Sequence, residues 1–351
     1  MNLLRFLGYS LIGTLLALFA LAFTLMFFPV NSGLRMIPIN NENNFMRAIP
    51  NQSIVFSSGW TMANSHRQQT NNVGFPNSKD WIPAQHALVV IGDSYIESNM
   101  NDYPGTLQGQ LDAKLGNTSP VFAAGVSGAN VADYLLMAEF AKNNIHPEKL
   151  IIVIDEYDIL ESLPGHNTEY SSFIEKNGQL YLQLGKYSPS KVKEFVRKYI
   201  IARYIYLNLR YNPMVALRRE LRGSNRTLSN EAVNNTYNSN TVKAVDYFID
   251  RIQNYSGLSP ENIVFVVNCN RHQLYLNLPN PETPKRNALM DYFINQSKLK
   301  GIHIVDTCPI FAEYIRKTQT RIDYSPFDNH WNAKGHELAA KAVESVLRRQ
   351  N

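Results

Sequence analysis

The sequence around one serine, Ser94, is typical of a position that carries a nucleophile. The apolar residues 88–91 are followed by Gly92, Asp93 and Ser94, a pattern that predicts a buried strand, a tight turn and a helix N-terminus. Ser94 is therefore expected at the carboxyl end of a strand, where ligands bind in open α/β sheets, and the N–H groups and dipole of the next helix would favour an oxyanion. The alternative is structural: Ser94 only caps that helix, which would contribute about 1 kcal/mol.

A carboxylate and an imidazole lie two residues apart near the C-terminus, at Asp328 and His330. In an extended segment, residues i and i+2 project to the same side, so Asp328 can hold one ring nitrogen of His330. The other nitrogen can then take the proton of a serine hydroxyl, which is a poor nucleophile without such a base. His336 is a rival base, but it falls in the expected last helix, where a structural role is favoured. Ser94, His330 and Asp328 together indicate acyl transfer through a serine.

Alternating strands and helices are expected to position these residues. The predicted strands are 88–91, 121–124, 150–154, 263–267 and 302–305, and the predicted helices are 106–115, 131–143, 242–255, 284–300 and 333–348. Five apolar strands with intervening helices predict a three-layer α/β/α sandwich around a parallel five-stranded sheet.

The N-terminal segment differs in composition from the rest of the chain. Residues 6–28 form an uncharged apolar segment that is long enough for one transmembrane helix. We interpret this segment as an uncleaved signal anchor. Residues 29–50 are expected to be a linker and residues 51–351 one catalytic domain, interrupted by an insertion at about 164–240. The insertion is predicted to contain a hairpin at 173–182 and a helix at 190–209, and it either covers the site or elaborates the surface. The expected location is the inner (cytoplasmic) membrane, crossed once, with the domain on the periplasmic side.

Composition restricts the classes of partner. The formal net charge is +5, but Lys and Arg are scattered, so we expect no nucleic-acid partner. Cys269 and Cys308 each follow a predicted strand. Two neighbouring strands would bring them to one sheet edge, either as a disulfide or as two free buried thiols.

Four blocks in this order resemble the SGNH (GDSL-type) hydrolase superfamily: Gly92-Asp93-Ser94, residues 125–128, the strand 150–154 with the acidic segment 155–158 at its end, and the C-terminal Asp/His pair. The resemblance covers roughly residues 85–160 and 260–348 and implies a flavodoxin-like sandwich. It implies no cofactor and no metal.

The resemblance also assigns roles to particular residues. Ser94 would be the nucleophile, His330 the general base and Asp328 its partner. The N–H groups of Ser94 and Gly128 would donate to the oxyanion.

Two departures from that family bear on function. The Asp328-x-His330 spacing is one residue shorter than usual and is similar to that of membrane-associated SGNH-like proteins that O-acetylate exported polysaccharides. The third block, usually Gly-x-Asn-Asp or Gly-Asn-Asp, is replaced by residues 156–158. Its missing amide donor could be replaced by the Tyr157 hydroxyl or the Asn130 amide; without one, the rate would fall by about 10² to 10³.

Two charged residues are candidate substrate ligands. Asp158 follows the third strand and Arg271 the fourth, where Arg271 could bind an acidic sugar. The alternatives are a helix cap for Asp158 and a surface salt bridge for Arg271.

Three functions follow from these observations. The first is a membrane-anchored serine esterase that removes acyl groups, such as acetyl, from a glycan or glycoconjugate of the cell envelope. The second is an O-acyltransferase, which would need a multi-span membrane partner because one helix offers no route for an acyl donor. The third is a non-catalytic glycan-binding protein on a decayed hydrolase fold. The expected substrate is an acylated carbohydrate or small ester, and the membrane is contacted through the N-terminal helix.

Overall fold

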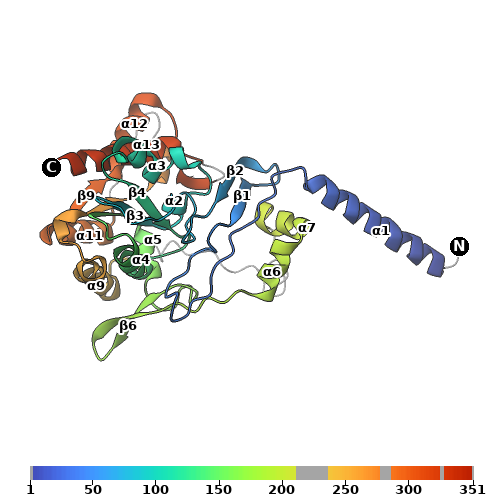
Figure 1. Ribbon diagram of the computed structural model, residues 1–351, viewed down its shortest axis with the longest axis horizontal. Coiled ribbons are helices and arrows are strands. Elements are labelled where there is room, and N and C mark those ends of the chain that lie inside the picture. The colour runs from blue at the N-terminus through green and yellow to red at the C-terminus, as the bar shows by residue number, and fades with distance from the viewer. Residues whose placement is uncertain (1–2, 211–235, 277–285, 325–327, 350–351) are drawn as a thin grey trace. The chain divides into compact units, whose positions relative to one another are not determined.

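One parallel sheet of five strands organises the larger part of the chain (Figure 1). The computed structural model describes residues 3–210, 236–276, 286–324 and 328–349. The strands of the sheet are β3 (Leu88–Gly92), β4 (Val121–Gly125), β5 (Lys149–Ile154), β8 (Ile263–Val267) and β9 (His303–Asp306). Their order across the sheet is β4-β3-β5-β8-β9, and every neighbouring pair is parallel. In chain order this is 2-1-3-4-5, the flavodoxin-like order, so the predicted fold class is confirmed.

The strands are mostly apolar because both faces of the sheet are covered. In β3, Val89 and Ile91 belong to one hydrophobic cluster, while Leu88 and Val90 belong to the other. Successive side chains of a strand point to opposite faces, so each strand supplies both cores. All five residues of β3 are buried.

Two helix layers cover the sheet. The first consists of α4 (Val131–Asn144), α9 (Ser239–Ser256) and α11 (Ala288–Leu299). The second consists of α3 (Leu107–Leu115), α12 (Thr307–Thr318) and α13 (Ala333–Arg348). Five of these were predicted within a few residues at each end. Helix α12 was not predicted, although its buried residues Cys308, Phe311, Ala312 and Ile315 follow the i, i+3, i+4, i+7 pattern of an amphipathic helix.

Short elements connect the layers. The helical ones are α2 (Ser94–Glu97), η1 (Tyr103–Gly105), α5 (Glu156–Glu161), η4 (Pro260–Asn262) and α10 (Arg271–Leu276). The strands are β6 (Ser172–Lys176) paired with β7 (Gln179–Gln183), and β10 (Asp323–Tyr324) paired with β11 (Asp328–Trp331). The pair β6–β7 is the hairpin predicted at 173–182.

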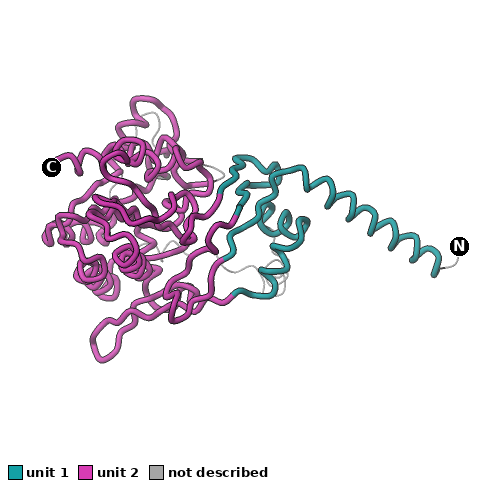
Figure 2. The backbone as a smooth tube through the Cα atoms, in the orientation of Figure 1, with its two compact units in different colours: residues 1–35, 53–68, 189–227 teal, residues 36–52, 69–188, 228–351 magenta. Residues whose placement is uncertain are grey.

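The chain divides into two units, coloured separately in Figure 2. Unit 1 contains residues 1–35, 53–68 and 189–227, and unit 2 contains residues 36–52, 69–188 and 228–351. Part of the expected linker at 29–50 is therefore not free, because Phe45 and Met46 are buried in the core of unit 2. Residues 211–235 of the insertion expected at about 164–240 lie outside the described residues.

Unit 1 contains the apolar N-terminal helix α1 (Leu3–Leu25). This helix has 23 residues and a mean hydropathy of 2.1, which is long and apolar enough to cross a membrane. The other elements of the unit are β1 (Ser53–Ser58), β2 (Ala63–Gln69), α6 (Lys191–Lys198), α7 (Ile200–Arg203) and the π-helical turn η2 (Tyr204–Asn208). The helix predicted at 190–209 is broken at Tyr199, whose backbone is extended.

The two cysteines form a disulfide. Cys269 follows β8 and Cys308 is the second residue of α12, with their Cα atoms 4.7 Å apart. Both residues are buried. Of the two alternatives open from the sequence, the structure contains the bond, because parallel neighbours β8 and β9 end at the same edge of the sheet.

Removing this disulfide should destabilise unit 2. The bond joins residues 39 positions apart, and the loss of that constraint on the unfolded chain costs about 4 kcal/mol in the chain-entropy treatment. We expect a Cys269→Ala/Cys308→Ala variant to unfold at lower guanidinium concentration than the parent, followed by circular dichroism. Dithiothreitol should shift the parent in the same direction and leave the variant unchanged. Equal midpoints for parent and variant would contradict the prediction.

Candidate active site

Ser94 lies on the turn between β3 and α2, at the carboxyl end of the sheet. The capping residue is Asp93, whose side chain accepts the N–H of Tyr95, so the predicted capping role of Ser94 is wrong. Ser94 is the first residue of α2. The helix is a single turn that ends at Glu97, so its dipole is far weaker than the sequence argument assumed.

The structure brings the other two predicted residues to this hydroxyl. The Oγ atom of Ser94 lies 2.7 Å from Nε2 of His330, and Nδ1 of His330 is hydrogen-bonded to Oδ1 of Asp328. The same Asp328 oxygen accepts the backbone N–H of His330 at 2.9 Å. A carboxylate only accepts, so Nδ1 carries the hydrogen and Nε2 of the neutral ring accepts from Ser94. This is the order of groups that activates a serine.

Burial and charge act in opposite directions on His330. Burial lowers the pKa of its ring, while the hydrogen bond to Asp328 and the charges of Asp328 and Asp93 raise it. The net result is a pKa above the ordinary value of 6.5. The neighbouring carboxylates therefore make the ring a stronger base than a free imidazole.

Asp93 contributes to the site besides capping the turn. Its Oδ2 lies 3.1 Å from the Ser94 hydroxyl, a second partner for the same hydrogen. Burial raises the pKa of Asp93, and the Tyr95 N–H bond and the nearby His330 partly offset this.

The rival base His336 is occupied elsewhere. It is fully buried in α13, where its Nδ1 accepts the N–H of Leu107 and its Nε2 lies 3.0 Å from the Ser98 hydroxyl. Burial lowers the pKa of His336 to about 3, so the ring stays neutral. We conclude that His336 joins α13 to the segment after α2 and does not serve Ser94.

Arg271 is buried and bound to other parts of the protein, so the surface salt bridge offered as its alternative role is wrong, and its contact with an acidic sugar stays a prediction. Its guanidinium is 5% exposed and donates to the Tyr95 hydroxyl at 2.6 Å and to the backbone oxygen of Asn329. It also donates to the side chain of Asn268 at 2.7 Å and pairs with Asp323 at 3.4 Å. Because Asn329 precedes His330, Arg271 fixes the segment that carries the base.

The ring of Tyr95 completes this support. Its centroid lies 5.1 Å from that of His330 and 5.0 Å from that of Trp331. The indole N–H of Trp331 donates to Asn268 at 3.0 Å. Neither Tyr95 nor Trp331 was a predicted site residue; their positions directly after Ser94 and His330 were the only signal.

The loops that follow the neighbouring strands β3 and β4 each contain a backbone N–H group predicted to bind the oxyanion. Within the described ranges, neither the N–H of Ser94 nor that of Gly128 donates a hydrogen bond. Gly128 has a φ of +81°, and a Cβ at this position would come within 2.8 Å of the Tyr170 hydroxyl. Only glycine therefore fits this turn, which is consistent with the predicted oxyanion role.

Glu97 is a site residue that sequence reasoning missed. Its carboxylate is 5% exposed and accepts both the N–H and the hydroxyl of Ser127, each at 2.7 Å. On the other side of the loop, Tyr170 donates to the Ser127 backbone oxygen at 2.6 Å. The residue before Gly128 is thus held from both sides. A buried glutamate three positions after the serine has no periodic or compositional signal.

Of the two predicted substitutes for the missing amide donor, one is already bound within the protein. Asn130 is buried as the N-cap of α4, and its amide donates to the backbone oxygen of Ser171 at 3.0 Å, so it is not available to an oxyanion. Tyr157 is 65% exposed in the first turn of α5, and its role stays a prediction.

Asp158 is also used internally. Its Oδ2 accepts the N–H of Asp155 at 2.7 Å and closes a capping box at the start of α5. It is 3% exposed, so the predicted contact with substrate is wrong and the capping alternative holds.

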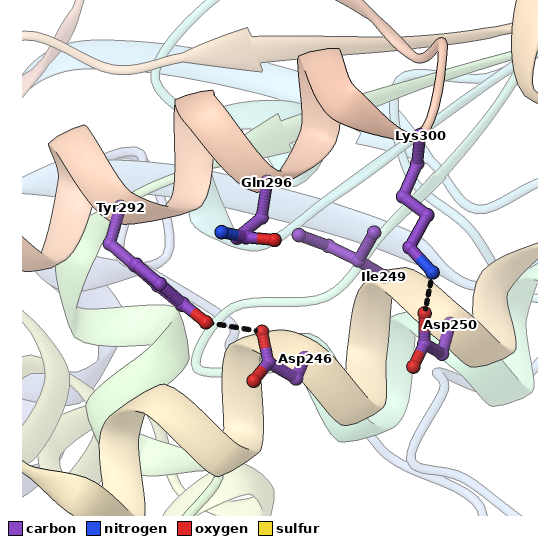
Figure 3. A pocket seen from close by; sticks show the side chains of 6 residues that line it. All are labelled: Asp246, Ile249, Asp250, Tyr292, Gln296 and Lys300. Atoms are coloured by element: carbon purple, nitrogen blue, oxygen red, sulfur yellow. Dashed lines mark hydrogen bonds and ion pairs between the residues drawn. The ribbon is translucent and has the colours of Figure 1, made fainter.

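A separate hollow lies between α9 and α11, as Figure 3 shows. It is lined by Asp246, Ile249, Asp250, Tyr292, Gln296 and Lys300. Asp250 pairs with Lys300 at 2.7 Å and Asp246 accepts from Tyr292 at 2.8 Å, so its charges are satisfied across the two helices. It contains none of the residues around Ser94. Among the described residues, no group of three His, Cys, Asp or Glu side chains could hold a metal ion.

No protein-family model matches the sequence, and no curated protein matches it. Similar solved structures include an α/β hydrolase enzyme from the metagenome of Lake Arreo, Spain, at 14% identity and a TM-score of 0.40, covering 77% of this chain and 99% of that one. A member of the lipolytic G-D-S-L family from Veillonella parvula has 11% identity and a TM-score of 0.38, with coverages of 75% and 98%. An acetylxylan esterase from Geobacillus stearothermophilus, solved as a catalytic mutant, has 13% identity and a TM-score of 0.39, with coverages of 76% and 96%.

Proposed function

We propose that this protein is a serine ester hydrolase that removes acyl groups from an acylated carbohydrate of the cell envelope. The observation that carries the proposal is the continuous line of contacts from the Ser94 hydroxyl through His330 to Asp328. This arrangement serves to make a hydroxyl nucleophilic. The ester class follows from that chemistry, and the carbohydrate class follows from the motif resemblance.

The mechanism uses these residues in two steps. His330 takes the Ser94 proton at Nε2 while Oγ attacks the acyl carbonyl carbon, and the N–H groups of Ser94 and Gly128 stabilise the oxyanion. The sugar oxygen leaves with that proton, and the acyl group stays on Oγ. Water then attacks the acyl-enzyme with His330 again as base, which releases the carboxylic acid and restores Ser94. Asp328 keeps the ring oriented and stabilises its cation.

The setting we propose is a single-pass anchor in the inner membrane with the catalytic unit on the periplasmic side. The length and hydropathy of α1 support an anchor. The buried disulfide supports an oxidising compartment for unit 2, since such bonds are rare in the cytosol. Acyl transfer to a sugar hydroxyl in place of water uses the same residues and is one outcome of the test below.

The first test is labelling and hydrolysis by the full chain in detergent. We expect a fluorophosphonate probe to label the parent but not Ser94→Ala. We expect aryl-acetate hydrolysis to fall by about 10⁴-fold or more in both Ser94→Ala and His330→Ala, because the serine and the histidine work together and neither functions without the other. Ser345→Ala, on the exposed face of α13, is the matched control and should retain activity.

The outcomes separate the candidate functions. A parent that is neither labelled nor active would overturn the serine mechanism and favour a binding protein. Labelling with slow hydrolysis that a sugar acceptor accelerates, with ester formed on the sugar, would favour the transferase.

The pH dependence tests the role of Asp328. Neutral His330 is the active form, so activity should be present above its pKa and lost as the pH falls through it, with a midpoint above 6.5. In Asp328→Asn the partner that raises this pKa is gone, so the midpoint should move to lower pH, and kcat should fall by about 10⁴-fold. The measurement is the pH profile of kcat/KM with an aryl acetate. A midpoint that does not move in the variant would argue against this role.

Replacing Glu97 tests the Ser127–Gly128 loop. Glu97→Gln presents an N–H₂ group where one Ser127 donor now binds, which displaces the Gly128 N–H from the oxyanion. We expect a kcat lower by on the order of 10² and a nearly unchanged KM, since small misplacements of catalytic groups have effects of this size. Glu175→Gln, at an exposed glutamate, is the matched control. An unchanged kcat in a folded Glu97→Gln variant would show that the loop does not depend on this carboxylate.

A further inference from the structure

The end of helix α1 is built into unit 1. Leu25, its last residue, is 5% exposed. The Ser57 hydroxyl donates to the backbone oxygen of Pro29 at 2.5 Å, and the N–H of Asn31 donates to the side chain of Asn208 at 2.9 Å. The chain is therefore bound to β1 and η2 within a few residues of the helix end.

This attachment fixes where unit 1 lies if α1 crosses a bilayer. A helix of 23 residues is about 35 Å long, slightly more than the hydrocarbon core of about 30 Å. The headgroup layer adds only about 5–7 Å on each side. With no free linker after Leu25, unit 1 has to meet the headgroups directly.

Helix α6 presents exposed apolar side chains, here called the α6 stripe, which the described residues of the unit leave uncovered. Val192 and Phe195 are 66% and 59% exposed, and their i, i+3 spacing places them side by side on the helix. Tyr199, directly after the helix, is 48% exposed, and its ring centroid lies 4.7 Å from that of Phe195. Val196, one turn after Val192, is buried. Helix α6 contacts α7, and α7 contacts α1, so the stripe belongs to the elements beside the base of the anchor (Figure 1).

An exposed tryptophan lies in the same unit. Trp60, in the turn between β1 and β2, is 74% exposed, and the Tyr204 hydroxyl donates to its backbone oxygen at 3.0 Å. The other two tryptophans, Trp81 and Trp331, are buried in unit 2. Trp and Tyr are the side chains enriched at membrane interfaces, because they combine an apolar ring with one polar group.

The charge of this region suits anionic headgroups. Between Lys191 and Arg210 the chain has six basic residues and one acidic residue, Glu194. Glu194 is itself paired with Arg197 at 2.9 Å and lies 3.8 Å from Arg35. The basic side chains thus remain in excess over the whole segment.

We propose that unit 1 rests on the lipid–water interface of the membrane that α1 spans, with the α6 stripe and Trp60 inserted at headgroup depth. The inference depends on the membrane anchor of the proposed function and goes beyond it, because it adds a second contact surface. An interfacial helix with apolar and basic faces is held by buried apolar area and by attraction to anionic lipid. The occupant of the surface is lipid, and a protein partner is the competing outcome.

Tryptophan quenching by brominated lipid tests this with the full chain. The protein is reconstituted in vesicles of phosphatidylcholine and phosphatidylglycerol, with or without bromine on the acyl chain near the headgroup. We expect the parent to lose the Trp60 share of its emission in brominated vesicles and Trp60→Phe to show no loss, because its remaining tryptophans are buried. If Trp60 is not quenched and its emission maximum is that of a tryptophan in water, the proposal is overturned. A protein partner for the stripe would then be favoured.

Three further variants, made in the Trp60→Phe background, complete the design. Phe19→Trp, at an exposed position of α1, should be strongly quenched whenever the anchor spans the bilayer. Quenching there without quenching of Trp60 in the parent overturns only the interfacial contact, whereas no quenching at either position overturns the anchor itself. Phe195→Trp should be quenched, while Leu299→Trp, at an exposed apolar position on α11, should not.

Vesicles of phosphatidylcholine alone test the charge argument. Weaker quenching of Trp60 and of Phe195→Trp in these vesicles would support attraction of the basic residues to anionic lipid. Equal quenching in both compositions would overturn that part of the proposal.

Discussion

The buried guanidinium of Arg271 is the interaction on which the geometry around Ser94 depends. It joins the Tyr95 side chain, directly after the serine, to the backbone oxygen of Asn329, directly before His330. It also pairs with Asp323, a carboxylate buried as deeply as itself. A buried ion pair gains little net stability, but loss of one partner leaves an uncompensated charge and costs about 3–5 kcal/mol. Paired with Asp323, the Arg271 guanidinium stays buried, and its bonds to Tyr95 and Asn329 hold the serine turn and the histidine segment in one relative position.

The parallel sheet makes this meeting possible. Strands β3, β4, β5 and β8 run in the same direction, so the segments that follow them emerge at one edge. Ser94, Gly128, Asp155 and Asn268 all come shortly after these strands. The neighbouring strands β3 and β5 lie at the point where the strand order reverses, which in doubly wound sheets is where ligands bind. The base is supplied separately, from the short antiparallel strand β11.

Two buried acids near strand ends have structural roles. Glu97 lies five residues after β3 and Asp158 four residues after β5, and their carboxylates accept backbone N–H groups of Ser127 and Asp155. Burial raises the pKa of each, because the charged form loses water. Glu97 acts on the loop of Gly128, and Asp158 only on the start of α5. The two acids differ in the backbone segment that each one binds, and no local sequence pattern reveals which segment that is.

The sequence by itself determined the sheet, most of its helices, the serine turn and the Asp328–His330 pair, because strand periodicity and neighbouring residues are local properties. It determined neither α12 nor the break of the helix at Tyr199. The assignment of Arg271, Asn130 and Asp158 to structure, of Glu97 to the site, and of the cysteines to a disulfide required the tertiary fold. Each depends on a partner brought near by packing of the whole domain. A polar side chain near a strand end can face a ligand or a buried N–H, and only the surroundings decide between them.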